Sequence, residues 1–217
     1  LDAKLRGEMR YELKTLQQRL QTTMVYVTHD QIEAMTLGDR ITVMSNGEIQ
    51  QVAAPTTVYD QPFNRFVAAF IGTPVMNFLS GTIERAGSGL AFRLAGGGLV
   101  PLTMPEQGRL AACIGQPLVL GVRPERLAHG GFTPDAPGLG TVELEVAVIE
   151  LMGDHQYVYL RGPGIAGPLI MKCDSHHRCT PGERIPVRFA TALAHVFASM
   201  DEHAESLTLP PDFARQQ

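Results

Sequence analysis

From about residue 78 onward, the sequence consists of short segments rich in β-branched and aromatic residues, separated by clusters of glycine and proline. The segments at 90–94 and 117–125 are typical, and the cluster AGGG at 95–98 lies between them. Many short strands with regular turn signals are typical of a small β-barrel or β-sandwich. Residues 141–148 alternate between apolar and polar side chains, which predicts a strand with one buried face. The apolar side chains expected on that face are Val142, Leu144, Val146 and Val148.

The first 77 residues follow a different pattern, in which helical and strand-like segments alternate. Residues 3–20 place apolar side chains at steps of three and four, which predicts an amphipathic helix. The run MVYV at 24–27 is short and apolar on both faces, which predicts a buried central parallel strand. Residues 31–37 are expected to form a short helix, with Asp30 as its N-cap.

Two strand-like runs follow, and Asn46-Gly47 between them is a strong signal for a hairpin turn. Alternation of helix and strand marks an α/β segment, whereas the later part of the chain is expected to be all β. We therefore predict two domains, an α/β part over 1–77 and an all-β barrel or sandwich over 78–217, with their boundary between 75 and 80; the family resemblance described below implies that the second is an OB-like barrel.

Composition narrows the class of partner and compartment. The 217 residues carry a formal net charge of -4, which gives no electrostatic reason to expect a nucleic acid as partner. Three cysteines in a chain of this length make a disulfide framework a poor expectation, so a reducing cytoplasm is the predicted compartment. No stretch reaches the roughly 18 to 20 apolar residues that span a bilayer. The opening segment LDAKLRGEMR is charged and has no apolar signal-peptide core.

The segment VYVTHDQIEAMTLGDRITVMSNGEIQQVAAP at 25–55 strongly resembles the ATPase subunits of ABC importers for sugars and related solutes, of the maltose and glycerol-phosphate type. Residues 59–81 resemble the stretch where the nucleotide-binding domain of that family passes into the regulatory domain. GVRPERL at 121–127 resembles a motif within that second domain, an OB-like or TOBE domain. The resemblance covers essentially the whole chain, and its first 80 residues are the most specific.

The resemblance implies a subunit that hydrolyses ATP with Mg²⁺. It would work as a homodimer docked on two membrane-spanning subunits, at the inner face of the bacterial plasma membrane. His29 would be the switch histidine, whose imidazole donates a hydrogen bond to the γ-phosphate; phosphoryl transfer depends mainly on such positioning and charge stabilisation. Asp2 would belong to the D-loop and reach across the nucleotide-domain dimer. In the structural alternatives, His29 is a polar residue at a strand end whose hydrogen bonds are made within the fold, and Asp2 caps the helix beginning at Ala3.

Three motifs of the family have no counterpart in this sequence: the phosphate-binding loop GxxxxGK[ST], the LSGGQ signature and the acidic Walker B segment. We therefore expect a C-terminal fragment that binds neither ATP nor Mg²⁺ and is inactive by itself. The alternative is a stand-alone β module, without ATPase activity, that serves dimerisation or regulation or senses a small ligand. A regulatory protein or a small ligand could bind the β domain in either case.

Two further groups of candidate functional residues lie in the second part of the chain. Cysteines and adjacent histidines in the run CDSHHRC at 173–179 offer zinc-type donors, but the spacing lacks the usual C-x(2–4)-C pair, so no metal is predicted. Arg123 and Glu125 flank Pro124 at the end of a strand-like run. We expect them to pair locally as a strand terminator, and the alternative is an interface where regulatory domains meet each other or a regulator.

Overall fold

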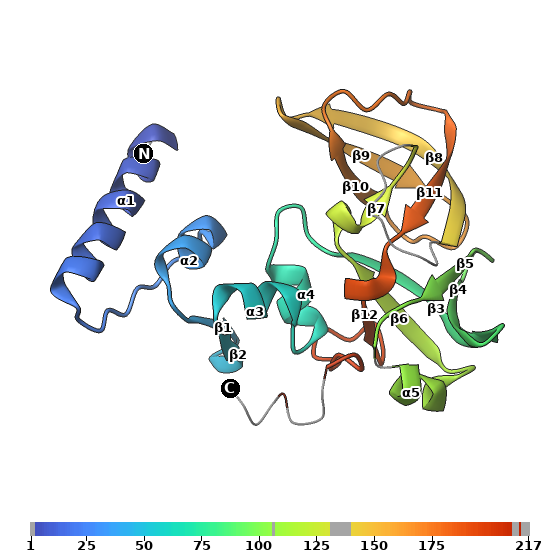
Figure 1. Ribbon diagram of the computed structural model, residues 1–217, viewed down its shortest axis with the longest axis horizontal. Helices are drawn as coiled ribbons and strands as arrows, with labels where there is room; N and C mark the ends of the chain where they lie inside the picture. The colour runs from blue at the N-terminus through green and yellow to red at the C-terminus, as the bar shows by residue number, and fades with distance from the viewer. Residues whose placement is uncertain (1–2, 106, 131–139, 210–212, 214–217) are drawn as a thin grey trace.

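The computed structural model describes residues 3–105, 107–130, 140–209 and 213 (Figure 1). An N-terminal part of four helices and one hairpin precedes two five-stranded antiparallel sheets. In chain order this part contains α1 (Ala3–Leu20), α2 (Gln31–Leu37), β1 (Ile41–Ser45), β2 (Glu48–Ala53), α3 (Pro55–Asp60) and α4 (Arg65–Phe70). Among the described residues, no helix is long and apolar enough to cross a membrane.

Local signals in the sequence produce the expected local structure. The Asp30 side chain accepts hydrogen bonds from the backbone N–H groups of Ile32 and Glu33 and so caps α2. Asn46 and Gly47 take positive φ values of 51° and 82°, and they form the turn of the β1–β2 hairpin. Both predictions are confirmed.

The strand predicted at 24–27 is wrong for this chain. Residues 22–28 form no regular element, and Val25 and Val27 are 91% and 92% exposed. A central strand needs neighbours on both edges to pair its backbone N–H and C=O groups. The described part of the chain gives this segment no such neighbour, so its apolar composition alone does not make a strand. Figure 1 shows it as an extended link between α1 and α2, at the end of the molecule away from the sheets.

The rest of the chain forms two antiparallel sheets. The first has the order β12-β6-β3-β4-β5, and the second has the order β10-β9-β8-β11-β7. The strands of the first sheet are β3 (Asn77–Ala86), β4 (Gly89–Leu94), β5 (Leu99–Leu102), β6 (Pro117–Val122) and β12 (His195–Phe197). Those of the second are β7 (Leu127–Ala128), β8 (Gly140–Leu151), β9 (His155–Arg161), β10 (Leu169–Asp174) and β11 (Arg184–Phe189). Short helical segments connect them: α5 (Gln107–Leu110), η1 (Ala111–Cys113), η2 (Pro124–Arg126) and η3 (Thr191–Leu193).

One hydrophobic core joins the two sheets. Phe92 and Leu120 from the first sheet pack in the same buried cluster as Leu160 and Phe189 from the second, and all four side chains are fully buried. Alternating apolar residues on short strands bury one face of each sheet, which is the basis of small barrels and sandwiches. The predicted class, an α/β segment followed by an all-β domain with barrel-like packing, is confirmed.

The alternation predicted for 141–148 holds only up to a β-bulge. Leu144 and Val146 are buried, but Val148 is 47% exposed. The pairing of β8 with β9 shifts register between Val146 and Val148, so one extra residue lies on the β8 side. A bulge reverses the face on which later side chains lie, and Ile149 instead of Val148 packs against the core.

The N-terminal part and the β domain are packed together. A small cluster combines Ala68 of α4 and Met76 with Val119 of β6 and Phe197 of β12, so apolar packing crosses the boundary predicted near residue 77. The segment 201–206 then returns to α4. Its carbonyl groups at 202 and 204 accept hydrogen bonds from the N–H groups at 66 and 65, which belong to the first turn of the helix.

Candidate functional site

His29 lies in the turn that enters α2, and its side chain is exposed. The residues on both sides of it are fixed. The Thr28 hydroxyl donates to Glu33 Oε2 at 2.6 Å and accepts from the N–H of Asp30 at 2.9 Å. Asp30 also forms an ion pair with Arg6 of α1, with 3.6 Å between Nη1 and Oδ2. An ordered backbone therefore presents an imidazole that is free to meet a ligand. Asp2 lies outside the described residues.

Arg123 lies at the junction of the two parts of the chain, immediately after β6. It is only 4% exposed. Nη2 donates to the Tyr59 carbonyl oxygen at 2.8 Å, while Nη1 donates to the carbonyl oxygens of Ile71 and Ala68. Burial lowers the pKa of Arg123. Backbone carbonyl groups of α3, α4 and the segment after α4 thus converge on one guanidinium from the β domain.

Tyr59 connects Arg123 with Glu125. Its ring centroid lies 4.0 Å from the guanidinium carbon of Arg123, and its hydroxyl donates to Glu125 Oε1 at 2.7 Å. Burial and this hydrogen bond raise the pKa of Tyr59 to about 12. Arg123 and Glu125 therefore both contact a side chain of α3, and they lie at a joint within one chain. The sequence singles out both residues but gives no signal for their shared partner, which is 64 positions before Arg123.

Gly72 allows this joint to close. Its φ is +117°, and a Cβ atom there would lie 2.7 Å from Arg123 Nη1. Only glycine meets both conditions without strain, because it accepts positive φ and leaves room for the guanidinium. The Gly-x-Pro ending at Pro74 signals the end of a helix, but it does not reveal this contact.

Two protein-family models match the β domain of this chain. A MalK OB fold domain model matches residues 72–127, and a TOBE domain model matches residues 120–197. The chain is 40% identical over 199 residues to the sn-glycerol-3-phosphate import ATP-binding protein UgpC of Chromohalobacter salexigens, covering 91% of this chain and 50% of that protein. It is 42% identical over 200 residues to the trehalose/maltose import ATP-binding protein MalK of Thermococcus litoralis, covering 91% and 52%. The chain belongs to the MalK and UgpC family of ABC-importer ATP-binding subunits.

The matched part is the C-terminal region of these subunits. A third relative, the putative uncharacterized ABC transporter ATP-binding protein YcjV of Escherichia coli K12, is 41% identical over 209 residues, covering 94% of this chain and 54% of that protein. The chain spans about half the length of the curated relatives it matches. Within it, Arg123 lies in the stretch that both family models share, whereas His29 precedes both.

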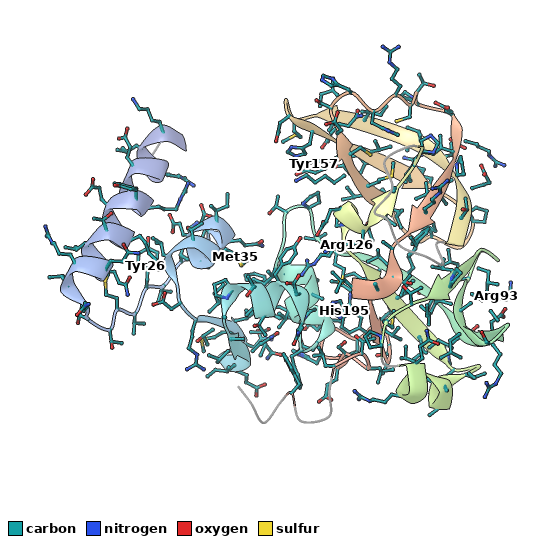
Figure 2. The ribbon with its side chains drawn as sticks, viewed as in Figure 1. Tyr26, Met35, Arg93, Arg126, Tyr157 and His195 are labelled. Atoms are coloured by element: carbon teal, nitrogen blue, oxygen red, sulfur yellow. The ribbon has the colours of Figure 1, made fainter. Side chains whose placement is uncertain are left out.

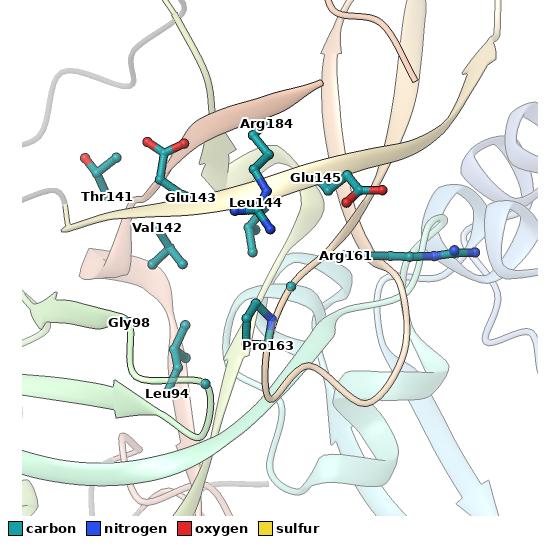
Figure 3. A pocket seen from close by; sticks show the side chains of 12 residues that line it. Leu94, Gly98, Thr141, Val142, Glu143, Leu144, Glu145, Arg161, Pro163 and Arg184 are labelled. Carbon is teal, nitrogen blue, oxygen red and sulfur yellow. The ribbon is translucent and has the colours of Figure 1, made fainter. Parts of the chain in front are cut away.

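An open cavity of about 590 Å³ lies beside β8, and both matched regions of the β domain line it (Figure 3). Leu94, Val142 and Pro163 face it, while the Arg161 side chain extends away. The polar side chains of its lining are exposed to solvent. A ligand there would meet a small apolar wall and hydrated charges, an arrangement that gives little orientation to a bound molecule.

The cysteine and histidine residues at 173–179 are spread over the end of β10 and the connection that follows. Cys173 is buried, and burial raises the pKa of its thiol to about 12. The ring of His177 packs edge-on against His129, with 5.2 Å between their centroids. Across the part of the chain that the structure describes, no group of three or more His, Cys, Asp and Glu side chains is arranged to hold a metal ion.

Proposed function

We propose that the chain is the C-terminal region of the ATP-hydrolysing, energy-coupling subunit of an importer for a sugar or a related solute. Two relatives are named as import ATP-binding proteins, for sn-glycerol-3-phosphate and for trehalose and maltose. The observation that carries the proposal is the His29 turn, in which an exposed imidazole is held between two residues with fixed hydrogen bonds. In this role His29 donates a hydrogen bond to the γ-phosphate of ATP.

This chain contains only some of the residues that a site for ATP and Mg²⁺ needs. His29 is suited to contact a phosphate oxygen, but the sequence contains no glycine loop followed by lysine that could cradle the phosphates. ATP supplies the phosphoryl group and Mg²⁺ neutralises its charge when they are bound to the complete subunit. The contribution of this chain is a hydrogen-bond donor at a fixed place, which stabilises charge on the transferred group.

We further propose that the complete subunit works as a homodimer on two membrane-spanning subunits, at the inner face of the plasma membrane. The Tyr59–Arg123–Glu125 joint supports a role for the β domain in this assembly, because it ties that domain to α3, in the same part of the chain as His29.

The experiment is a comparison of His29→Ala with the wild type in the complete subunit, reconstituted with its membrane partners. We expect ATP hydrolysis to fall about 100-fold or more, with ATP binding nearly unchanged, because one transition-state hydrogen-bond donor is lost. His176→Ala, which removes an exposed imidazole in the β domain, is the matched control. Loss of ATP binding, or unchanged hydrolysis, would contradict the proposed role.

A further inference from the structure

Gln31, the first residue of α2, links the His29 turn to the end of α4 and the residues that follow it. Its Nε2 donates to the carbonyl oxygen of Phe70, and its Oε1 accepts from the N–H of Gly72 at 2.9 Å. One side-chain amide therefore pairs with a C=O and an N–H two residues apart. This is how a neighbouring strand would pair with the same backbone.

Arg123 contacts the same segment through the intervening carbonyl group. It donates to the carbonyl oxygen of Ile71, and its guanidinium packs against Gly72. Ile71 has an extended backbone, with φ -97° and ψ 122°. Successive carbonyl groups of an extended backbone point in opposite directions. Gln31 and Arg123 therefore bind the segment 70–72 from opposite sides.

The segment between these two side chains has little freedom to move separately. The Ile71 side chain is 2% exposed and packs in the core of the N-terminal part with Val58 and Val67. Arg123 is attached to the same part at Tyr59. At the other end, Gln31 lies two positions from His29, within the turn that Asp30 caps. A shift of Arg123 relative to the core would thus reach the His29 turn through three hydrogen-bonded contacts.

We propose that Gln31 is a positioning residue for His29, and that it holds the His29 turn at a place set by Arg123 of the β domain. The β domain thereby sets the position of the His29 imidazole through Gln31. The structural link stands without any assumption about activity. Its effect on ATP hydrolysis rests on the proposed function.

The first test uses imidazole NMR signals of the chain itself. The His29 signals report on the His29 turn. The His195 signals report on the β-domain side of the joint, since His195 is buried beside Arg123 and the Asp60 backbone. Gln31→Ala should shift the His195 signals, and Arg123→Lys should shift those of His29. Gln18→Ala, which changes an exposed glutamine of α1, should move neither.

If Arg123→Lys fails to fold, Gln31→Ala and Gln31→Glu still decide the matter. Gln31→Glu keeps the acceptor for the Gly72 N–H but loses the donor to Phe70, so its effect on His195 should be the smaller of the two. Signal changes that stay within residues 29–33 and 70–72 would overturn the proposal.

The second test measures hydrolysis by the complete subunit. Gln31→Ala should lower kcat by about 2- to 30-fold, the range for couplings through packed networks, with KM for ATP unchanged. In a His29→Ala background the same substitution should add no further loss, because Gln31 acts through His29. Additive losses would overturn the positioning role. A complete subunit without ATPase activity would refute the proposed function, and the NMR result would still decide the link.

Discussion

The guanidinium of Arg123 lies against the ring of Tyr59 at 4.0 Å, and its Nη2 donates to the carbonyl oxygen of the same residue. One side chain of the β domain thus contacts both the ring and the backbone of one residue of α3. Figure 2 shows His195 near the middle of the molecule, where the sheets meet the helices, and Tyr26 beside α1, away from the sheets. The joint between the two parts of the chain is therefore polar at its centre and desolvated.

Arg123→Leu should destabilise the chain strongly. The leucine leaves the carbonyl oxygens of Tyr59 and Ile71 buried without their donor, and each unsatisfied group costs about 1–3 kcal/mol. We expect a loss of about 3 kcal/mol or more in the free energy of unfolding, measured by urea denaturation. Tyr59→Phe, which removes only the hydroxyl bond to Glu125, should cost about 1 kcal/mol. Equal effects of the two substitutions would show that the carbonyl contacts of Arg123 contribute little.

Gly72→Ala separates backbone strain from the loss of space. Alanine at Gly72 must adopt a φ of +117° and would place its Cβ 2.7 Å from Arg123 Nη1. Gly47→Ala is the matched control, because Gly47 also has a positive φ, +82°, but nothing lies within 4 Å of the added Cβ. Strain alone costs about 1–2 kcal/mol. We expect Gly47→Ala to lose that amount in thermal or urea unfolding and Gly72→Ala to lose clearly more. A smaller loss at Gly72 would mean that Arg123 moves aside freely.

His195 should make the stability of the chain depend on pH. Burial, together with the nearby charge of Arg123, lowers the pKa of His195 from 6.5 to about 4. Between these values the unfolded chain binds a proton that the folded chain does not, so stability rises with pH across this window. The contribution is fully present above pH 6.5 and is lost as the pH falls towards 4. It amounts to about 3 kcal/mol.

The measurement is urea denaturation at a series of pH values. His195→Gln should flatten the stability curve between pH 4 and 6.5, whereas His176→Gln, at an exposed histidine, should leave its slope unchanged. A His195→Gln curve as steep as that of the wild type would rule out His195 as the source of the pH dependence.

The sequence alone predicted the local structure correctly wherever a few neighbouring residues determine that structure. Asp30 caps α2 through its own next turn, and Asn46-Gly47 closes a hairpin between adjacent strands. Short strands with turn signals between them predicted the all-β second domain. By contrast, the bulge before Val148 depends on how β8 pairs with β9, so alternation along one strand could not reveal it.

The joint was beyond prediction because its partners are distant in sequence. Arg123 and Glu125 could be singled out from their motif, and His29 from a family resemblance. Tyr59, Gly72 and Gln31 carry no comparable local signal. Their roles appear only when α3 and the segment after α4 pack on Arg123, and α2 packs on that segment. The shape of the joint is thus a property of tertiary packing.

Val25 and Val27 provide a last test, which concerns the segment where the predicted strand does not form. Both side chains are over 90% exposed, so Val25→Ser together with Val27→Ser should change the free energy of unfolding of this chain by no more than about 0.5 kcal/mol. Val67→Ala, at a fully buried position of α4, is the comparison and should cost about 1–3 kcal/mol. A clear loss from the double serine variant would show that the segment is buried in solution. An unchanged stability would mean that its apolar character contributes nothing to the folding of this chain, because apolar side chains stabilise a fold only when they leave water.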